Sequence, residues 1–367
     1  MAVKIVRQPD QIALLGSPSS AAAMSAGREN APAALRAARL AERLRQAGYQ
    51  VTDLGDDPPR LFAPDEENPR ARNIQRVLAA IESLKPRVEL AVKSGALPLV
   101  LAGDCFPVLA IIAGVRRYFR HAAMIYMDRD ADLHTPANTT TGSLDGMTVS
   151  HATGRGAAEV VRFWGEPPLI RDPDLALFGV ERMDPAEEQT LGRVPLRSYS
   201  AAQIMRMGTA AAAKEAVERI HGSSGELILH LGVDVIAGFE ATDDPGAGGL
   251  SADAVREALA VFASQKHLAA ISVAAYNPAR DADGRGAKQV VDLLVEMLEK
   301  RRRAFPSAPT SATAGAPEPA PQKASAQVAG AEEARPAETH ENETASNEEH
   351  SEGGLAETAS DPDDSHS

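Results

Sequence analysis

The 367-residue sequence has one cysteine, no long apolar run and no concentration of basic residues. The single cysteine, Cys105, excludes an internal disulfide and fits a reducing compartment. No window approaches the roughly 20 apolar residues that a membrane helix needs. The first residues, Met1-Ala2-Val3-Lys4, lack the apolar core of a signal peptide. We therefore expect a cytoplasmic protein that does not enter the membrane.

The acidic residues are concentrated at one end of the chain. The formal net charge is −13, and residues 306–367 hold 13 acidic and 2 basic residues, a net charge of −11 that leaves −2 for residues 1–305. A nearly neutral body offers no basic face for phosphates, so nucleic acid is not an expected partner.

Residues 306–367 are rich in Ala, Pro, Glu, Ser and Thr and contain no aromatic residue. This composition cannot bury enough apolar surface to offset the entropy of ordering, so we expect a disordered tail. Its role stays open between a solubilising extension and an acidic interaction segment. Residues 1–305 contain no Pro/Gly-rich linker and are expected to form one domain.

Short aliphatic runs alternate with longer segments of helical period along residues 1–305. This alternation predicts an α/β fold in which helices cover both faces of a parallel sheet. The eight expected strands lie at 12–15, 51–54, 99–102, 123–127, 175–180, 194–199, 227–233 and 270–274. The main expected helices lie at 33–47, 73–94 with an interruption at Pro86, 201–221, 252–264 and 287–303.

Cysteine and aspartate residues directly follow three of these strands. They are Cys105 after the third strand, Asp128, Asp130 and Asp132 after the fourth, and Asp234 after the seventh. Open α/β sheets bind ligands at the carboxyl ends of their strands. Side chains two residues apart in extended chain point the same way, so the three neighbouring aspartates can converge. Two unit charges about 4 Å apart repel by about 4 kcal/mol at an effective dielectric constant of about 20, which favours a divalent cation among them. Solvated or helix-capping aspartates are the alternative.

The motifs at these positions resemble those of the arginase/agmatinase/formiminoglutamase (ureohydrolase) family. Residues 102–105 read Ala-Gly-Asp-Cys where the family has Gly-Gly-Asp-His. Residues 128–136 read Asp-Arg-Asp-Ala-Asp-Leu-His-Thr-Pro, similar to Asp-Ala-His-x-Asp with its Asn-Thr-Pro run. Residues 232–236 read Gly-Val-Asp-Val-Ile against Ser-Phe-Asp-x-Asp, and 139–146 look like the family's Thr/Ser-rich loop. The resemblance covers about residues 10–300.

The resemblance implies a three-layer α/β/α fold around an eight-stranded parallel sheet, assembled as a homo-oligomer, a trimer or hexamer. It also implies two bridged Mn²⁺ ions and hydrolysis of C–N bonds in linear amidines. Asp128, Asp132 and Asp234 match family metal ligands, whereas Cys105 and Asp130 replace histidine ligands. The last ligand of the second subsite has become isoleucine, at position 236.

These substitutions affect the two metal subsites differently. The first would keep Cys105, Asp128, Asp132 and Asp234, and the second would be one ligand short. We therefore expect one firmly bound ion and a weak or absent second. Mn²⁺ is the expected metal, and a thiolate ligand leaves Zn²⁺ or Fe²⁺ open.

The resemblance also implies substrate contacts. The residues matched to the part of the site that faces an amino acid are Thr139, Thr141, Asp184 and Glu187, with His134 in place of an asparagine. Asp145 replaces the proton-shuttling histidine, and Ala275 replaces the glutamate that clamps the guanidinium. We therefore expect an amino-acid-like substrate whose reactive group differs from plain guanidinium.

Three further residues have competing interpretations. His151 is a candidate for the missing proton shuttle, although a structural role is the commoner one for such a residue. His230 is expected to be a core histidine or a neighbour of the metal ligands rather than a ligand itself. Arg129 either neutralises the aspartates or faces solvent. Two functions stay open: a metal-dependent amidinohydrolase in which Asp145 moves protons, and a pseudoenzyme that binds a ligand or a protein.

Overall fold

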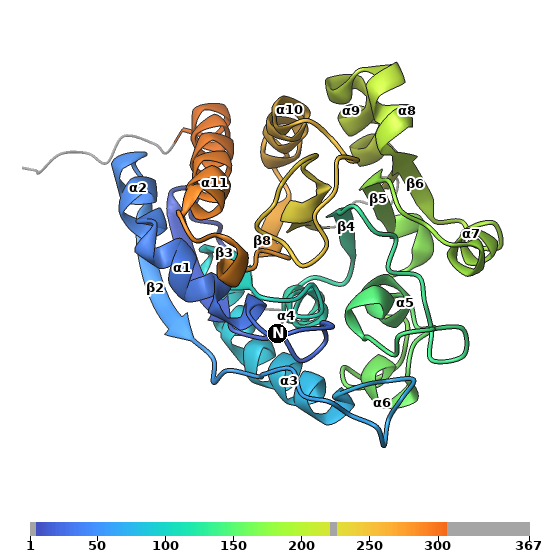
Figure 1. Cartoon of the computed structure of the whole chain (residues 1–367). Coiled ribbons are helices and arrows are strands. Elements are labelled where there is room, and N and C mark those ends of the chain that lie inside the picture. Colours follow the sequence, from blue (N-terminus) through green and yellow to red (C-terminus); the bar gives the residue numbers. More distant parts are fainter. Residues whose placement is uncertain (1–4, 221–225, 307–367) are drawn as a thin grey trace, which may run out of the picture. The chain divides into compact units, whose positions relative to one another are not determined.

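All eight expected strands form, and they make one parallel sheet (Figure 1). The computed structural model describes residues 5–220 and 226–306. The strands are β1 (Gln11–Ser17), β2 (Gln50–Asp56), β3 (Leu97–Ala102), β4 (Ala122–Met127), β5 (Leu175–Val180), β6 (Arg197–Ser200), β7 (Glu226–Gly232) and β8 (Leu268–Ala274). Their order in the sheet is β2-β1-β3-β8-β7-β4-β5-β6. Strands β3, β4, β5 and β8 are buried along their whole length, which explains their unbroken apolar sequences.

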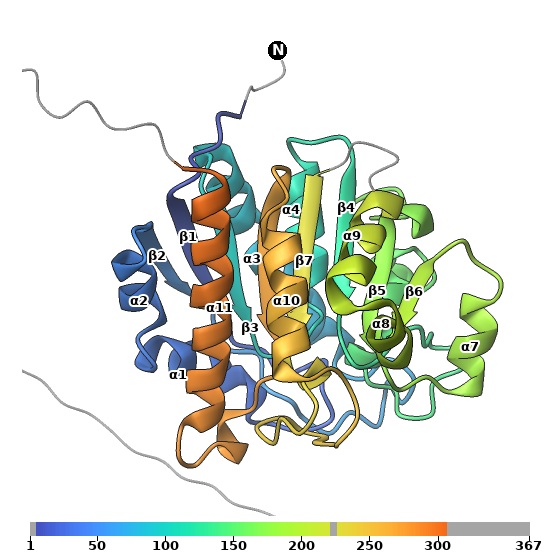
Figure 2. The same cartoon turned by 90° about the horizontal axis from the view of Figure 1, so that it is seen from above.

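Helices cover both faces of this sheet, which confirms the predicted three-layer α/β/α architecture. They are α1 (Ala31–Ala37), α2 (Leu40–Gln46), α3 (Ile74–Ser94), α4 (Val108–Arg116), α5 (Thr148–Ala152), α6 (Ala158–Val161), α7 (Pro185–Leu191), α8 (Ala201–Met207), α9 (Thr209–Ile220), α10 (Ala252–Ala263) and α11 (Arg285–Ala304). One layer contains α1, α2, α8, α9, α10 and α11, and the other contains α3, α4 and α5 (Figures 1 and 2).

Three expected helices differ in detail from the prediction. The helix expected at 33–47 is two helices, because Arg39 adopts a left-handed φ of 66° between them. The helix expected at 201–221 is divided at Gly208, which has a φ of 83°. The interruption expected at Pro86 is wrong: α3 runs through it. Buried residues on either side of Pro86, such as Leu84 and Val88, hold the helix against its neighbours despite the missing N–H.

The strand order brings the carboxyl ends of β7 and β4 side by side at the centre of the sheet. Residues that follow these strands therefore meet at one edge, which is where open α/β sheets bind ligands. No helix of the described part of the chain is long and apolar enough to cross a membrane. The expected tail, 306–367, lies outside the described residues except for Pro306, so its disorder and the domain boundary stay predictions.

Candidate metal centre

Three aspartates gather where β4 and β7 end. Asp128 directly follows β4, and Asp234 lies in a 3-10 turn, Val233–Val235, directly after β7. Ligand oxygens of Asp128, Asp130 and Asp234 lie within 4.8 Å of one another, and we call these residues the carboxylate triad. A glycine makes this approach possible, because a Cβ at Gly232 would lie 1.9 Å from Oδ2 of Asp128.

The chain itself does not fully compensate the negative charge that the ionised triad would carry. Burial, and then the charge of Asp130, raise the pKa of Asp128 to about 7. Burial and the charge of Asp128 raise the pKa of Asp234 well above its ordinary value. Oδ1 of Asp234 is buried and has no hydrogen-bond partner within the described residues. Hard oxygen ligands with an unsatisfied buried atom fit a divalent cation.

Cys105 and His230 extend this centre on the other side of Asp128. Sγ of Cys105 lies 3.6 Å from Oδ2 of Asp128, and Nε2 of His230 lies 3.8 Å from the same oxygen. Ligand atoms of these three residues also fall within 4.8 Å of one another. Burial, reinforced by nearby aspartates, raises the pKa of the Cys105 thiol well above its ordinary value, so it is neutral unless a cation binds.

His230 is both a core residue, as expected, and a neighbour of the metal centre. Its ring is fully buried and stacks on Tyr126 at 4.4 Å between centroids, and Nδ1 lies 3.1 Å from Oγ of Ser272. Nε2 is buried without a hydrogen-bond partner among the described residues. Burial lowers the pKa of His230 to about 3, so the imidazole is neutral and its Nε2 can act as a metal ligand.

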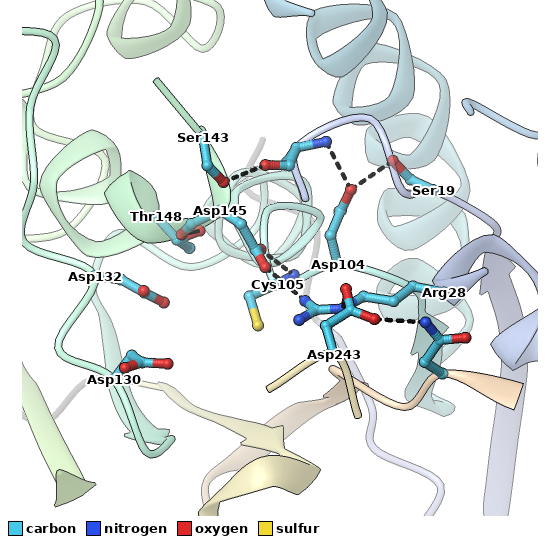
Figure 3. A network of polar contacts seen from close by, with 12 residues as sticks. Ser19, Arg28, Asp104, Cys105, Asp130, Asp132, Ser143, Asp145, Thr148 and Asp243 are labelled. Atoms are coloured by element: carbon cyan, nitrogen blue, oxygen red, sulfur yellow. Dashed lines mark hydrogen bonds and ion pairs between the residues drawn. The ribbon is translucent and has the colours of Figure 1, made fainter. Parts of the chain in front are cut away.

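Asp132 takes a different position from the one that the extended-chain argument predicts. The chain leaves the strand after Met127, and Asp132 adopts a left-handed φ of 51°. The hydroxyl of Tyr126 donates to its carboxylate. Asp132 therefore belongs to none of the three potential ligand groups found in the described residues, although it lies near Cys105 (Figure 3).

Two arginines supply positive charge at this edge of the sheet. Arg182, which follows β5, pairs with Asp130 through two hydrogen bonds and also with Asp244. Arg28 is buried, and its guanidinium contacts Asp145 and Asp243, each at 2.7 Å. Neither arginine can be identified from the sequence, because neither lies in a motif that indicates a partner.

Asp145, at the expected proton-shuttle position, is fixed by donors on both oxygens (Figure 3). Oδ1 accepts from the backbone N–H of Cys105 at 2.7 Å, and Oδ2 accepts from Nη1 of Arg28 at 2.7 Å. The nearby carboxyl of Asp104 accepts from Ser19, and burial followed by the charge of Asp145 raise its pKa to about 7.

His151 is occupied by backbone groups rather than directed at the carboxylate triad. Nε2 accepts from the N–H of Ala157 at 3.0 Å, so the ring proton is on Nδ1, which donates to the carbonyl of Met147 at 2.8 Å. The ring is buried, and burial lowers its pKa to about 4. Both nitrogens are used inside the protein, so this geometry does not favour a proton shuttle.

The residues expected to contact the amino-acid part of a substrate lie in two places, a histidine–carboxylate group and a loop. Nε2 of His134 lies 3.2 Å from Oδ2 of Asp184 and 3.9 Å from Oε2 of Glu187. Asp184 and Glu187 form a capping box at the start of α7, so both also have a structural role. Thr139 and Thr141 lie in an exposed loop, where Oγ1 of Thr139 accepts from the N–H of Gly142 at 2.9 Å.

Two positions at which the ureohydrolase motifs have a carboxylate contain buried apolar side chains in this chain. Ile236 is 2% exposed and Ala275 is 1% exposed. Arg129 neither neutralises the triad nor faces solvent, because it is buried and pairs with Glu181 at 3.0 Å.

Comparison with known proteins identifies the family of this chain. Residues 10–299 match the family model described as "Arginase family". The arginase of Bacillus subtilis is 27% identical over 297 residues, which cover 79% of this chain and 98% of that protein. The crystal structure of arginase from Bacillus cereus has a TM-score of 0.71 at 25% identity and covers 79% of this chain and 98% of that one. Formimidoylglutamase from Bacillus subtilis, 18% identical with a TM-score of 0.61 over 82% of this chain and 89% of that one, has the same fold. This chain belongs to the arginase family.

Proposed function

We propose that this protein is a metal-dependent hydrolase of C–N bonds in linear amidines, acting on an amino-acid-like substrate. The carboxylate triad is the observation that carries the proposal, because its three ligand oxygens lie within 4.8 Å of one another beside a buried, unsatisfied oxygen of Asp234. Asp128, which belongs to both ligand groups, would hold one divalent ion, with Asp234 from one group and Cys105 and His230 from the other as candidate further donors. We propose Mn²⁺, and the sulfur and imidazole donors keep Zn²⁺ and Fe²⁺ as alternatives.

A bound divalent ion would supply a nucleophilic water at neutral pH and polarise the reacting carbon. The carboxyl group of Asp145 is held in place by Nη1 of Arg28 and the N–H of Cys105, which both donate to it. A carboxylate held in this position could accept a proton from the attacking water or a hydrogen bond from an amidine N–H. We do not assign this role to His151.

The proposed substrate differs from free arginine at its reacting end. Ala275 offers no carboxylate at the position matched to the guanidinium clamp, and its side chain is buried. An amidine or amidine-like group that needs no second anionic anchor suits this site better. The loop with Thr139 and Thr141 and the group formed by His134, Asp184 and Glu187 would contact the amino-acid part.

A second candidate function is a pseudoenzyme that binds a ligand or a protein partner. It is favoured by the two arginines, because Arg182 and Arg28 already provide cations for Asp130 and Asp145. A site in which arginines replace part of the metal charge can keep its aspartates without catalysing hydrolysis.

Metal content separates these functions. The full-length protein, produced with added manganese, is analysed for bound metal beside its Asp128→Ala variant, and both are assayed for ammonia, urea or amide release from a panel of guanidino and amidino amino acids. We expect about one ion per chain, lost in the variant, and turnover of an amidino acid in preference to L-arginine. A wild-type protein without any bound ion would exclude the hydrolase and leave the pseudoenzyme. The homo-oligomer proposed from family resemblance is tested by sedimentation of the same sample.

A further inference from the structure

Arg182 is held next to Asp130 by the backbone as well as by its side chain. Residues Asp130 and Arg182 form a parallel bridge beyond the ends of the neighbouring strands β4 and β5. The N–H groups of Glu181 and Arg182 both donate to the carbonyl of Arg129, at 2.9 and 3.1 Å. The position of the guanidinium therefore follows from the register of the sheet.

The side-chain contact is a two-pronged ion pair. Nε of Arg182 donates to Oδ1 of Asp130 at 2.8 Å, and Nη2 donates to Oδ2. Nη1 pairs with Asp244 on the loop that follows β7. The planar guanidinium matches a carboxylate in this geometry, and the pair occupies both oxygens of Asp130.

This ion pair differs from an ordinary surface pair because Asp130 belongs to the carboxylate triad. A ligand oxygen of Asp130 lies within 4.8 Å of ligand oxygens of Asp128 and Asp234, so the guanidinium that pairs with Asp130 places a positive charge beside all three carboxylates. A second divalent ion at Asp130 would lie next to this guanidinium, and the two positive charges would repel each other.

We propose that Arg182 is the resident cation of this centre, taking the place of a second metal ion at Asp130 and limiting the protein to one ion per chain. The inference rests on the proposed function for the first ion. Ile236, two residues after Asp234, acts in the same direction, because its buried alkyl side chain cannot bind a metal ion. Arg182 thus determines the number of ions rather than the chemistry of the first one.

The test is the number of ions bound by full-length wild type and by the Arg182→Met variant after equilibrium dialysis against millimolar Mn²⁺, measured by elemental analysis. Arg182→Met removes the charge but keeps a side chain of similar length. We expect one ion per chain in wild type and two in the variant, the second more weakly held. Arg182→Lys keeps a positive charge and should stay at one ion. Thermal melting with and without Mn²⁺ shows that each variant is folded.

The outcomes separate this inference from the proposed hydrolase. One ion in both wild type and Arg182→Met would overturn the role of Arg182 and leave the hydrolase standing, and two ions in wild type would do the same. No ion in wild type but one in Arg182→Met would support Arg182 as the resident cation and contradict the metal-dependent hydrolase. No ion in either folded protein would contradict both. The matched control is Arg129→Met, which removes a neighbouring arginine paired with Glu181 and should not change the wild-type number.

Discussion

Two groups of carboxylates at this edge of the sheet differ in what their oxygens bind. Asp184 accepts from the N–H groups of Ala186 and Glu187, and Glu187 accepts from those of Asp184 and Leu133. In the triad, Oδ1 of Asp234 has no partner in the described chain. Carboxylates that accept hydrogen bonds from several backbone N–H groups stabilise the fold, and we call Asp184 and Glu187 the saturated group. Carboxylates with an oxygen that lacks a donor are able to bind a cation. Changing one residue from each group tests this distinction.

The largest effect is expected at Asp234. Asp234→Asn removes an anionic ligand from the triad and should lower Mn²⁺ affinity by more than the roughly 10–100-fold that loss of an outer hydrogen bond costs. Isothermal titration of the chelated protein measures this change. Glu187→Gln, from the saturated group, should keep the wild-type affinity. Equal affinities of wild type and Asp234→Asn would show that the triad is not the metal site.

The next effect is a pH dependence caused by Asp128. In the chelated protein its pKa is raised from 3.8 to about 7, so the folded state holds more protons than the unfolded state between these values. The stability that the protonated carboxyl of Asp128 contributes is fully present below pH 3.8. It is lost as the pH rises from 3.8 to about 7. Asp128→Asn should therefore stabilise the chelated protein by roughly 4 kcal/mol above about pH 7 and hardly at all below pH 3.8. Urea unfolding of both proteins at about pH 8 and about pH 4 measures the difference; a variant less stable than wild type at the higher pH would contradict the raised pKa.

The smallest effect is expected in the saturated group. Glu187→Ala leaves the N–H groups of Leu133 and Asp184 without their acceptor and should lower the free energy of unfolding by about 2 kcal/mol. Asp184→Ala, which removes the helix cap, should cost about 1 kcal/mol. Denaturant unfolding measures both, and metal content should stay at the wild-type value. A loss of bound metal in Glu187→Ala would show that the two groups of carboxylates do not differ in metal binding.

Much of the fold follows from local sequence. The buried strands β3, β4, β5 and β8 follow from apolar runs, because a strand buried in a parallel sheet needs apolar side chains on both faces. The helix boundaries were less accurate, because neither the left-handed φ of Arg39 nor the continuation of α3 through Pro86 follows from the local sequence pattern. The placement of Cys105, Asp128 and Asp234 at one edge followed from their positions directly after strands.

By itself the sequence determined the parallel α/β sheet, the edge at which the aspartates meet and the family, because periodicity and motifs are read from residues close together in the chain. Tertiary structure alone decided which charges pair. Arg182 is 52 residues from Asp130, and Arg28 is 117 residues from Asp145. Such pairs depend on the order of strands in the sheet and on the loops beyond them, so no local pattern predicts that arginine cations lie beside these aspartates.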